Sequence, residues 1–136
     1  MDITIRERDG KLSLYFVEPG AGFSGMRESI GEDQIAEHLL EFLCWCQDET
    51  VRVKFEGDVS KLLNIEPENH GDTFIHIKGF PFLESRLLID DFEMDAKEFS
   101  SPGELMEYVV TEVAKRSGDF VKVRLEPEAA SLIGGA

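Results

Sequence analysis

Residues 3–17, with the sequence ITIRERDGKLSLYFV, predict a β-hairpin. Apolar and polar residues alternate from Ile3 to Arg8 and again from Lys11 to Val17, which is the period of a strand with one buried face. Between these two runs, Asp9-Gly10 is a residue pair that readily takes the positive φ angles of a two-residue hairpin turn. The chain is therefore expected to build part of its sheet from antiparallel strands.

Beyond the hairpin, helical periodicity predicts two main helices. The first covers about residues 32–47, and the second covers 102–116, where Ser101-Pro102-Gly103-Glu104 is a strong helix-start signal. Residues 59–65 predict a short helical turn. Alternating apolar residues predict the remaining strands, which are 51–56, 73–78, 84–94 and 121–125.

These elements follow one another in the order ββαβ(turn)ββαβ. Such an order predicts an α+β fold, with two main helices packed on a mostly antiparallel sheet of five to six strands. A length of 136 residues suits a single domain, which we expect to span residues 1–126. Residues 127–136 are expected to form a loosely ordered tail.

The segment after the hairpin is rich in glycine and is expected to be a long loop. Its residues 20–25, GAGFSG, match the G-x-G-x-x-G pattern of dinucleotide-binding proteins. That mechanism requires a strand that leads directly into a helix, whereas the predicted helix begins six residues after the last glycine. We therefore predict no bound cofactor, and we keep the loop as a candidate lid or recognition surface through Gly20, Gly22, Phe23 and Gly25.

Charge is the strongest compositional feature of the chain. There are 28 acidic and 14 basic residues, which give a formal net charge of -14. This charge repels phosphate backbones, so direct binding to nucleic acid is not expected, and it favours a protein partner with a basic surface. No apolar run is long enough to span a membrane. Two cysteines and no leader-like beginning predict a cytoplasmic location.

Two groups of residues are candidates for a site. The first is an acidic cluster after the strand at 84–94, which is predicted to contact a partner: Asp90, Asp91, Glu93 and Asp95. The second is a set of ring side chains that would line a pocket beneath the glycine-rich loop: His38, Trp45, His70 and His76. The histidines lack the spacing of a metal site, and the acidic cluster lacks the glycine and glutamate of a calcium-binding EF-hand loop. No metal is predicted.

The function predicted from these observations is non-enzymatic. Each catalytic template that we considered lacks a required residue or the required spacing, and the charge imbalance favours an acidic protein-binding or regulatory domain, such as an inhibitor or immunity-type protein. Two alternatives remain open. One is a small enzyme or ligand-binding protein with a pocket under the Gly20–Gly25 loop, and the other is a homo-oligomeric assembly protein, in its simplest form a homodimer.

Overall fold

The computed structural model describes residues 1–18, 23–46, 48–56, 58–68, 74–80, 86–91, 94–99 and 102–127, some of them by their backbone alone. These residues form strands β1 (Asp2–Arg8), β2 (Lys11–Glu18), β3 (Phe23–Ile30), β4 (Thr50–Glu56), β5 (Phe74–Phe80), β6 (Arg86–Asp91), β7 (Met94–Phe99) and β8 (Val121–Leu125). They also form a short 3₁₀ helix η1 (Glu32–Gln34) and the helices α1 (Ile35–Trp45), α2 (Val59–Leu62) and α3 (Pro102–Lys115). The predicted α+β class is confirmed.

All the described strands join one sheet, in the order β3-β2-β1-β4-β8-β5-β6-β7. β1 pairs with β4 and β5 pairs with β8 in parallel, whereas the neighbours in the other pairs run antiparallel. The sheet is therefore mixed, and the prediction of a mostly antiparallel sheet is wrong. Parallel neighbours need a long crossover connection, and here helical segments lie between β1 and β4 and between β5 and β8 along the chain.

The predicted strand number and order are also wrong, because the described residues contain eight strands. β3 begins at Phe23, inside the segment expected to be a loop, and β7 follows β6 beyond the single strand expected at residues 84–94. Gly25 lies opposite Phe16 in the β2–β3 register, and a Cβ atom at Gly25 would overlap the Phe16 ring. This glycine makes room for a packed ring, so its presence does not indicate a flexible loop.

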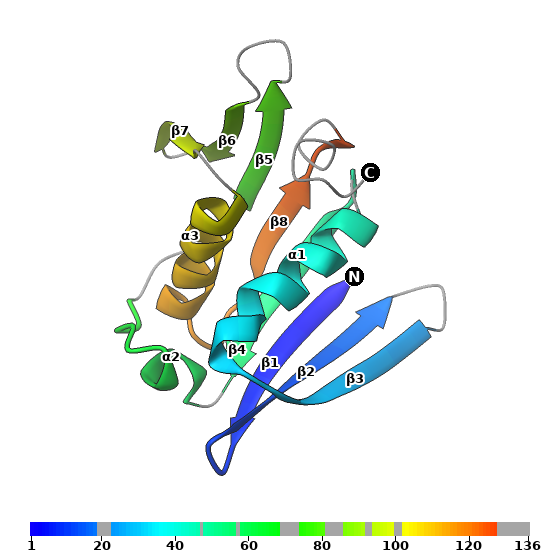
Figure 1. Ribbon diagram of the computed structural model, residues 1–136, viewed down its shortest axis with the longest axis vertical. Coiled ribbons are helices and arrows are strands. Elements are labelled where there is room, and N and C mark those ends of the chain that lie inside the picture. The colour runs from blue at the N-terminus through cyan, green and yellow to red at the C-terminus, as the bar shows by residue number, and fades with distance from the viewer. Residues whose placement is uncertain are drawn as a thin grey trace.

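The core lies between one face of the sheet and the helices (Figure 1). Alternate residues of the central strands are buried, among them Ile3 and Ile5 of β1 and Val51, Val53 and Phe55 of β4. The helices contribute apolar stripes to the same core, namely Ile35, Leu39, Phe42 and Leu43 of α1 and Leu105, Met106, Val109 and Val113 of α3. The buried residues of each helix recur every three to four positions, which is the spacing of one face of an α-helix.

The two cysteines lie at the end of α1 and are free thiols. Cys46 is buried in the core, whereas Cys44 is half-buried. Burial raises the pKa of both thiols. Since a thiolate is the reactive form of cysteine, neither residue has the environment of an activated nucleophile. In the part of the chain that the structure describes, no helix has the length and apolar character needed to cross a membrane.

Ser60 connects α2 to the last turn of α3. Its hydroxyl donates a hydrogen bond of 2.6 Å to the carbonyl oxygen of Ala114, and both residues are buried. The last carbonyls of a helix lack partners within the helix. The Gly118 amide, which follows Ala114 by four residues, instead donates to the carbonyl of Phe55. The Ser60 hydroxyl therefore donates a hydrogen bond to a buried carbonyl at the end of α3 that would otherwise have no donor.

We predict that Ser60→Ala lowers the free energy of unfolding by about 1–3 kcal/mol, because it removes the donor from a buried carbonyl. Urea unfolding followed by circular dichroism measures this loss. Ser13→Ala, at a half-buried position on the other face of the sheet, serves as the control and should change stability by less than about 0.5 kcal/mol. Equal stability of Ser60→Ala and the wild type would contradict the prediction.

Candidate partner-binding surface

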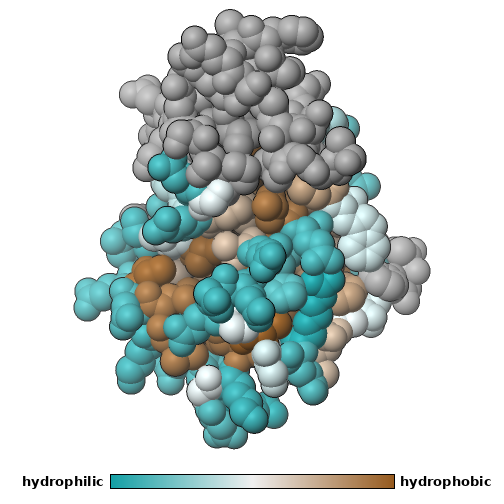
Figure 2. Space-filling model, viewed as in Figure 1, coloured by the Kyte–Doolittle hydropathy of each residue, from teal (hydrophilic) through white to brown (hydrophobic). Residues whose placement is uncertain are grey.

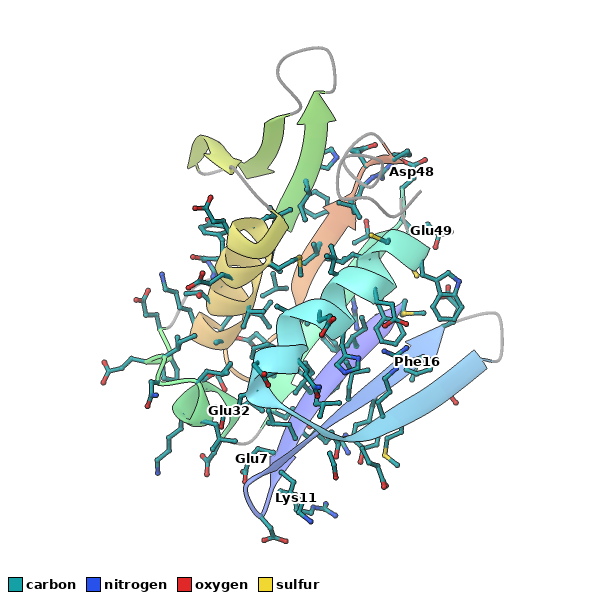
Figure 3. The ribbon with its side chains drawn as sticks, in the orientation of Figure 1. Glu7, Lys11, Phe16, Glu32, Asp48 and Glu49 are labelled. Atoms are coloured by element: carbon teal, nitrogen blue, oxygen red, sulfur yellow. The ribbon has the colours of Figure 1, made fainter. Side chains whose placement is uncertain are left out.

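The exposed side of η1 and α1 carries a row of carboxylates. Glu32, Asp33, Glu37 and Glu41 are all exposed, and residues 32–45 contain no lysine or arginine. Glu32 and Asp33 lie in the first turn, where the positive end of the helix dipole favours acidic residues. In Figure 3, Glu32 lies where the helical segment begins, and Asp48 and Glu49 lie beyond its far end. Negative side chains therefore lie along the helical segment and beyond both of its ends.

Trp45 lies at the C-terminal end of the same row. Glu37, Glu41 and Trp45 follow at intervals of four residues, which places them on one side of the helix. The Trp45 side chain is 59% exposed, yet its ring stacks on Phe42 with centroids 6.1 Å apart. Phe42 is fully buried and also contacts Phe16, at 4.9 Å between centroids. The buried Phe42, packed against the partly buried Phe16, thus supports an indole ring that remains largely in water.

One carboxylate of the row, Glu41, is already occupied by an internal cation. The Arg27 guanidinium of β3 donates to both oxygens of Glu41, at 2.9 and 3.0 Å, and lies 4.6 Å from the centre of the Phe42 ring. It also donates to Nδ1 of His38 at 2.7 Å, so the neutral imidazole carries its proton on Nε2. The hydrogen bond from Arg27 lowers the pKa of Glu41. We name the hydrogen-bonded residues Arg27, His38 and Glu41 the Arg27 clamp, because they join β3 to α1.

The opposite face of the sheet concentrates basic residues. Along the central strands, the positions that alternate with the core include Arg6, Arg52, Lys54, Lys122 and Arg124. Most of these cations pair with carboxylates on neighbouring elements, as in Arg52–Asp2 at 3.0 Å, Arg6–Glu56 at 2.8 Å and Arg124–Asp48 at 2.7 Å. In β4, Arg52 and Lys54 therefore lie on the face opposite the buried Val51, Val53 and Phe55.

Aromatic rings complete this basic face. Arg6 lies over the Tyr15 ring, and both Arg52 and Lys54 lie over the Phe120 ring, at 4.2–4.7 Å from the centroids. The hydrogen bond from Lys54, together with the one from Arg6, lowers the pKa of Glu56. Because the rings and the cations already contact one another and their own carboxylates, much of the positive charge of this face is neutralised within the chain.

A shallow hollow of about 630 Å³ lies at the hairpin end of the basic face. Its lining includes Arg8, Lys11 and Tyr15 together with the carboxylates of Glu28 and Glu56. Glu7 and Lys11, labelled in Figure 3, lie at the same end of the molecule. A lining with both signs of charge does not select an anion over a cation, so this hollow has no clear ligand preference.

The structure places the predicted site residues as follows. Asp90 and Asp91 lie in β6 and Asp95 lies in β7, each described by its backbone alone, and Glu93 lies outside the described residues. Gly20, Gly22 and His70 also lie outside them. Phe23 and Gly25 belong to β3. The acidic cluster and the proposed role of the glycine-rich segment therefore stay predictions.

The two described histidines do not converge. His38 lies on the helix side of the sheet in the Arg27 clamp, whereas His76 of β5 lies on the other face, where its Nε2 is 2.5 Å from Glu126. Trp45 lies about two helical turns after His38 on α1, at the C-terminal end of the acidic row. Within the described ranges, no three histidine, cysteine or acidic side chains are grouped as a metal site would require.

Sequence reasoning missed the acidic row on α1 as a site. The signal was present, because residues 32–45 include four carboxylates and no basic residue. The predicted partner-binding cluster was placed at residues 90–95, where acidic residues are denser along the chain. Density along the chain is a weaker guide than helical spacing, which determines whether side chains share a face.

Comparison with known proteins provides no relative from which a function could be transferred. No protein-family model, curated protein or solved structure matches the chain.

We predict that Arg27→Met raises the pKa of Glu41 toward the ordinary glutamate value, because the variant loses the hydrogen bonds and charge that stabilise the carboxylate. A group whose pKa is lowered by folding stabilises the fold above its unfolded pKa, and that stabilisation is lost as pH falls through the folded pKa. The carboxyl titration of Glu41, followed by NMR in both proteins, measures the change.

Arg8→Met is the matched control, since it removes an exposed arginine at the hairpin end of the molecule and should leave the Glu41 titration unchanged. If Glu41 titrates at the same pH in the Arg27→Met variant and the wild type, the clamp does not hold the carboxylate as described.

Proposed function

We propose that the chain is a non-enzymatic protein-binding domain that docks onto a basic surface of a protein partner. The binding surface is the exposed side of η1 and α1, formed by Glu32, Asp33, Glu37 and Trp45, and we name it the α1 surface. The observation that carries the proposal is an exposed tryptophan at the end of a helical segment, residues 32–45, that has four exposed carboxylates and no lysine or arginine of its own.

The distribution of charge supports this assignment. The carboxylates of the α1 surface lie on the helix side of the sheet, while the cations of β1, β4 and β8 project from the other side. Figure 2, which views the helix side, shows a hydrophilic surface over much of that layer. A face with one sign of charge attracts the opposite sign over several ångströms and accelerates encounter with a complementary partner.

Trp45 is expected to supply most of the binding energy of the α1 surface, which the carboxylates alone would not provide. Rim charges mainly affect the rate of association, whereas most binding energy at protein interfaces comes from a few residues, with tryptophan among the commonest. The stacking of Trp45 on the buried Phe42 restricts the ring before a partner arrives. Less conformational entropy is then lost on binding. An indole among carboxylates also suits a lysine or arginine from the partner, which contacts the ring face through a cation–π interaction.

Among partners of this kind, a protein whose own site is basic fits best. An acidic surface that covers such a site would act as an inhibitor, the mode that the composition of the chain already favours. A phosphate backbone does not fit, since the α1 surface and the net charge both repel it. The separation of His38 and His76 on opposite faces supports this proposal over a pocket built from histidines.

We predict that the triple variant E32Q/D33N/E37Q weakens capture of the partner and reduces the salt dependence of binding, because it removes the attraction and leaves the shape almost unchanged. The tagged chain and each variant are mixed with extract of the native host at low and high salt. Quantitative mass spectrometry then compares the retained proteins.

The triple variant E66Q/E107Q/D119N is the matched control, since it loses the same number of negative charges from exposed positions outside the α1 surface. It should retain the partner that the first variant loses. If both variants lose the partner equally, net charge alone drives the binding, and the α1 surface is not the site.

A second prediction concerns Trp45. Trp45→Ala should weaken the complex at least tenfold, because truncation of a tryptophan hot spot typically costs more than about 2 kcal/mol of binding free energy. Isothermal titration calorimetry with the purified partner measures the dissociation constant of each complex. Thr4→Ala changes a half-buried side chain of β1 on the face opposite the helices, away from both the α1 surface and β3, and should leave the affinity unchanged. Unchanged affinity in the Trp45 variant would show that the indole does not contact the partner.

A further inference from the structure

β3 lies at one edge of the sheet formed by the described strands (Figure 1). An edge strand presents unpaired backbone groups along one side, which can bind another strand. From Ser24 to Arg27 the register of β3 with β2 is regular. A bulge interrupts it further along, where Ser29 has a φ of 53°. The regular segment of this edge is therefore short and has a defined end.

Apolar side chains are exposed beside this regular segment. Met26 is 46% exposed and Val17 is 49% exposed, and both project from the face opposite the helices. Met26 lies directly opposite Tyr15 in the β2–β3 register, so the edge carries an adjoining Tyr15–Met26 pair. Of the three large hydrophobic side chains that are exposed in the described residues, two are therefore at this edge.

The devices that usually protect an edge from pairing are weak here. Natural edge strands carry proline, lysine or inward-pointing charges that resist another strand. Residues 23–28 read FSGMRE and contain no proline or lysine. The charge of Arg27 is directed onto α1 by its hydrogen bonds to Glu41 and His38. The charge of Arg27 is therefore paired within the chain on the helix side and is not directed at a second strand beside the edge.

We propose that the chain forms a symmetric homodimer in which two β3 strands pair antiparallel, with Met26 opposite Met26 of the second copy. The second copy fits this edge because the residues of β3 are compatible with the same residues in antiparallel pairing. When a strand pairs with its own copy, side chains share a face only if the pairing is centred on a residue, because side chains alternate along a strand. Centring on Met26 joins the two apolar pairs into a continuous Tyr15–Met26–Met26–Tyr15 row.

The other contacts of this register are compatible as well. Arg27 lies opposite Gly25 of the second copy, which has no side chain to obstruct the guanidinium, and Glu28 lies opposite a serine hydroxyl at Ser24. Centring on Arg27 would place two arginines opposite each other, and like charges directly opposite destabilise a strand pair. Of the two registers, the one centred on Met26 is therefore preferred.

The register can be tested by cysteine cross-linking. Directly opposite Cα atoms in an antiparallel pair are about 4.5–5.5 Å apart, within the range of a disulfide. We expect Met26→Cys to form a disulfide-linked dimer when a thiol oxidant such as diamide is added. Ser24→Cys is the matched control, because the two copies of residue 24 would be offset by roughly 13 Å along the strands. The wild type reports any background from Cys44 and Cys46.

The dimer itself is measured by analytical ultracentrifugation at about 200 µM protein, since association follows mass action. Each copy carries a net charge of -14, so repulsion opposes pairing at low salt. Dimer formation should increase at about 0.5 M sodium chloride, where charges are screened beyond about 4 Å. Binding to the α1 surface should instead weaken with salt, so the failure of one proposal is distinguishable from the failure of the other.

Met26→Lys should be monomeric under conditions where the wild type and Met26→Leu are dimeric, because two lysines would face each other across the seam. Circular dichroism confirms that each variant is folded. A wild type that remains monomeric at both salt concentrations overturns the proposal. Equal cross-linking of the Met26→Cys and Ser24→Cys variants also overturns it, because a specific register then does not exist.

Discussion

The alternation of side chains along the central strands constrains the rest of this structure. Each strand directs one row of residues into the core and the next row to the opposite face, and the described helices cover only one face. β4 shows the consequence, because Val51, Val53 and Phe55 are buried while Arg52 and Lys54 project outward. Many of the cations are therefore carried by strands, and the helices, exposed on their outer side, carry many of the carboxylates. An acidic chain thus folds into a molecule with distinct faces.

The Arg27 clamp connects this charge separation to the edge of the sheet. Arg27 reaches from β3 to α1 and crosses the Phe42 ring, so one guanidinium is shared by a carboxylate, an imidazole and an aromatic face. Phe42 in turn supports Trp45 on one side and packs against Phe16 on the other. Phe16 occupies the space left by Gly25 in β3. The α1 surface and the β3 edge therefore rest on the same aromatic cluster.

Much of the fold follows from patterns that depend on neighbours along the chain. The hairpin, the two main helices and the strand at residues 51–56 were predicted, because local periodicity indicates which type of element a segment forms. β3 was missed, because Gly25 was taken as a sign of a loop, whereas it makes room for the Phe16 ring on the neighbouring strand. The mixed character of the sheet was missed for a similar reason. Whether β1 pairs parallel with β4 depends on how a crossover packs, and no local pattern contains that information.

The candidate site shows the same limit. Counting acidic residues along the chain favoured residues 90–95, whereas spacing by four along a helix groups Glu37, Glu41 and Trp45. His38 and His76 were considered together because both are histidines, and the sheet separates them. The net charge of the chain indicates the sign of the charge on a partner's surface, and only the fold indicates which surface of the chain contacts that partner.

A dimer through β3 would change what the α1 surface can do. A two-fold axis perpendicular to the joined sheet keeps the helix layers of both copies on the same side. The two α1 surfaces would then face the same direction, and a partner with two basic sites could engage both at once. The second contact would be intramolecular, so its effective concentration would depend on the distance between the surfaces. Two weak surfaces on one rigid sheet can in this way bind more tightly than either alone, without any additional contact.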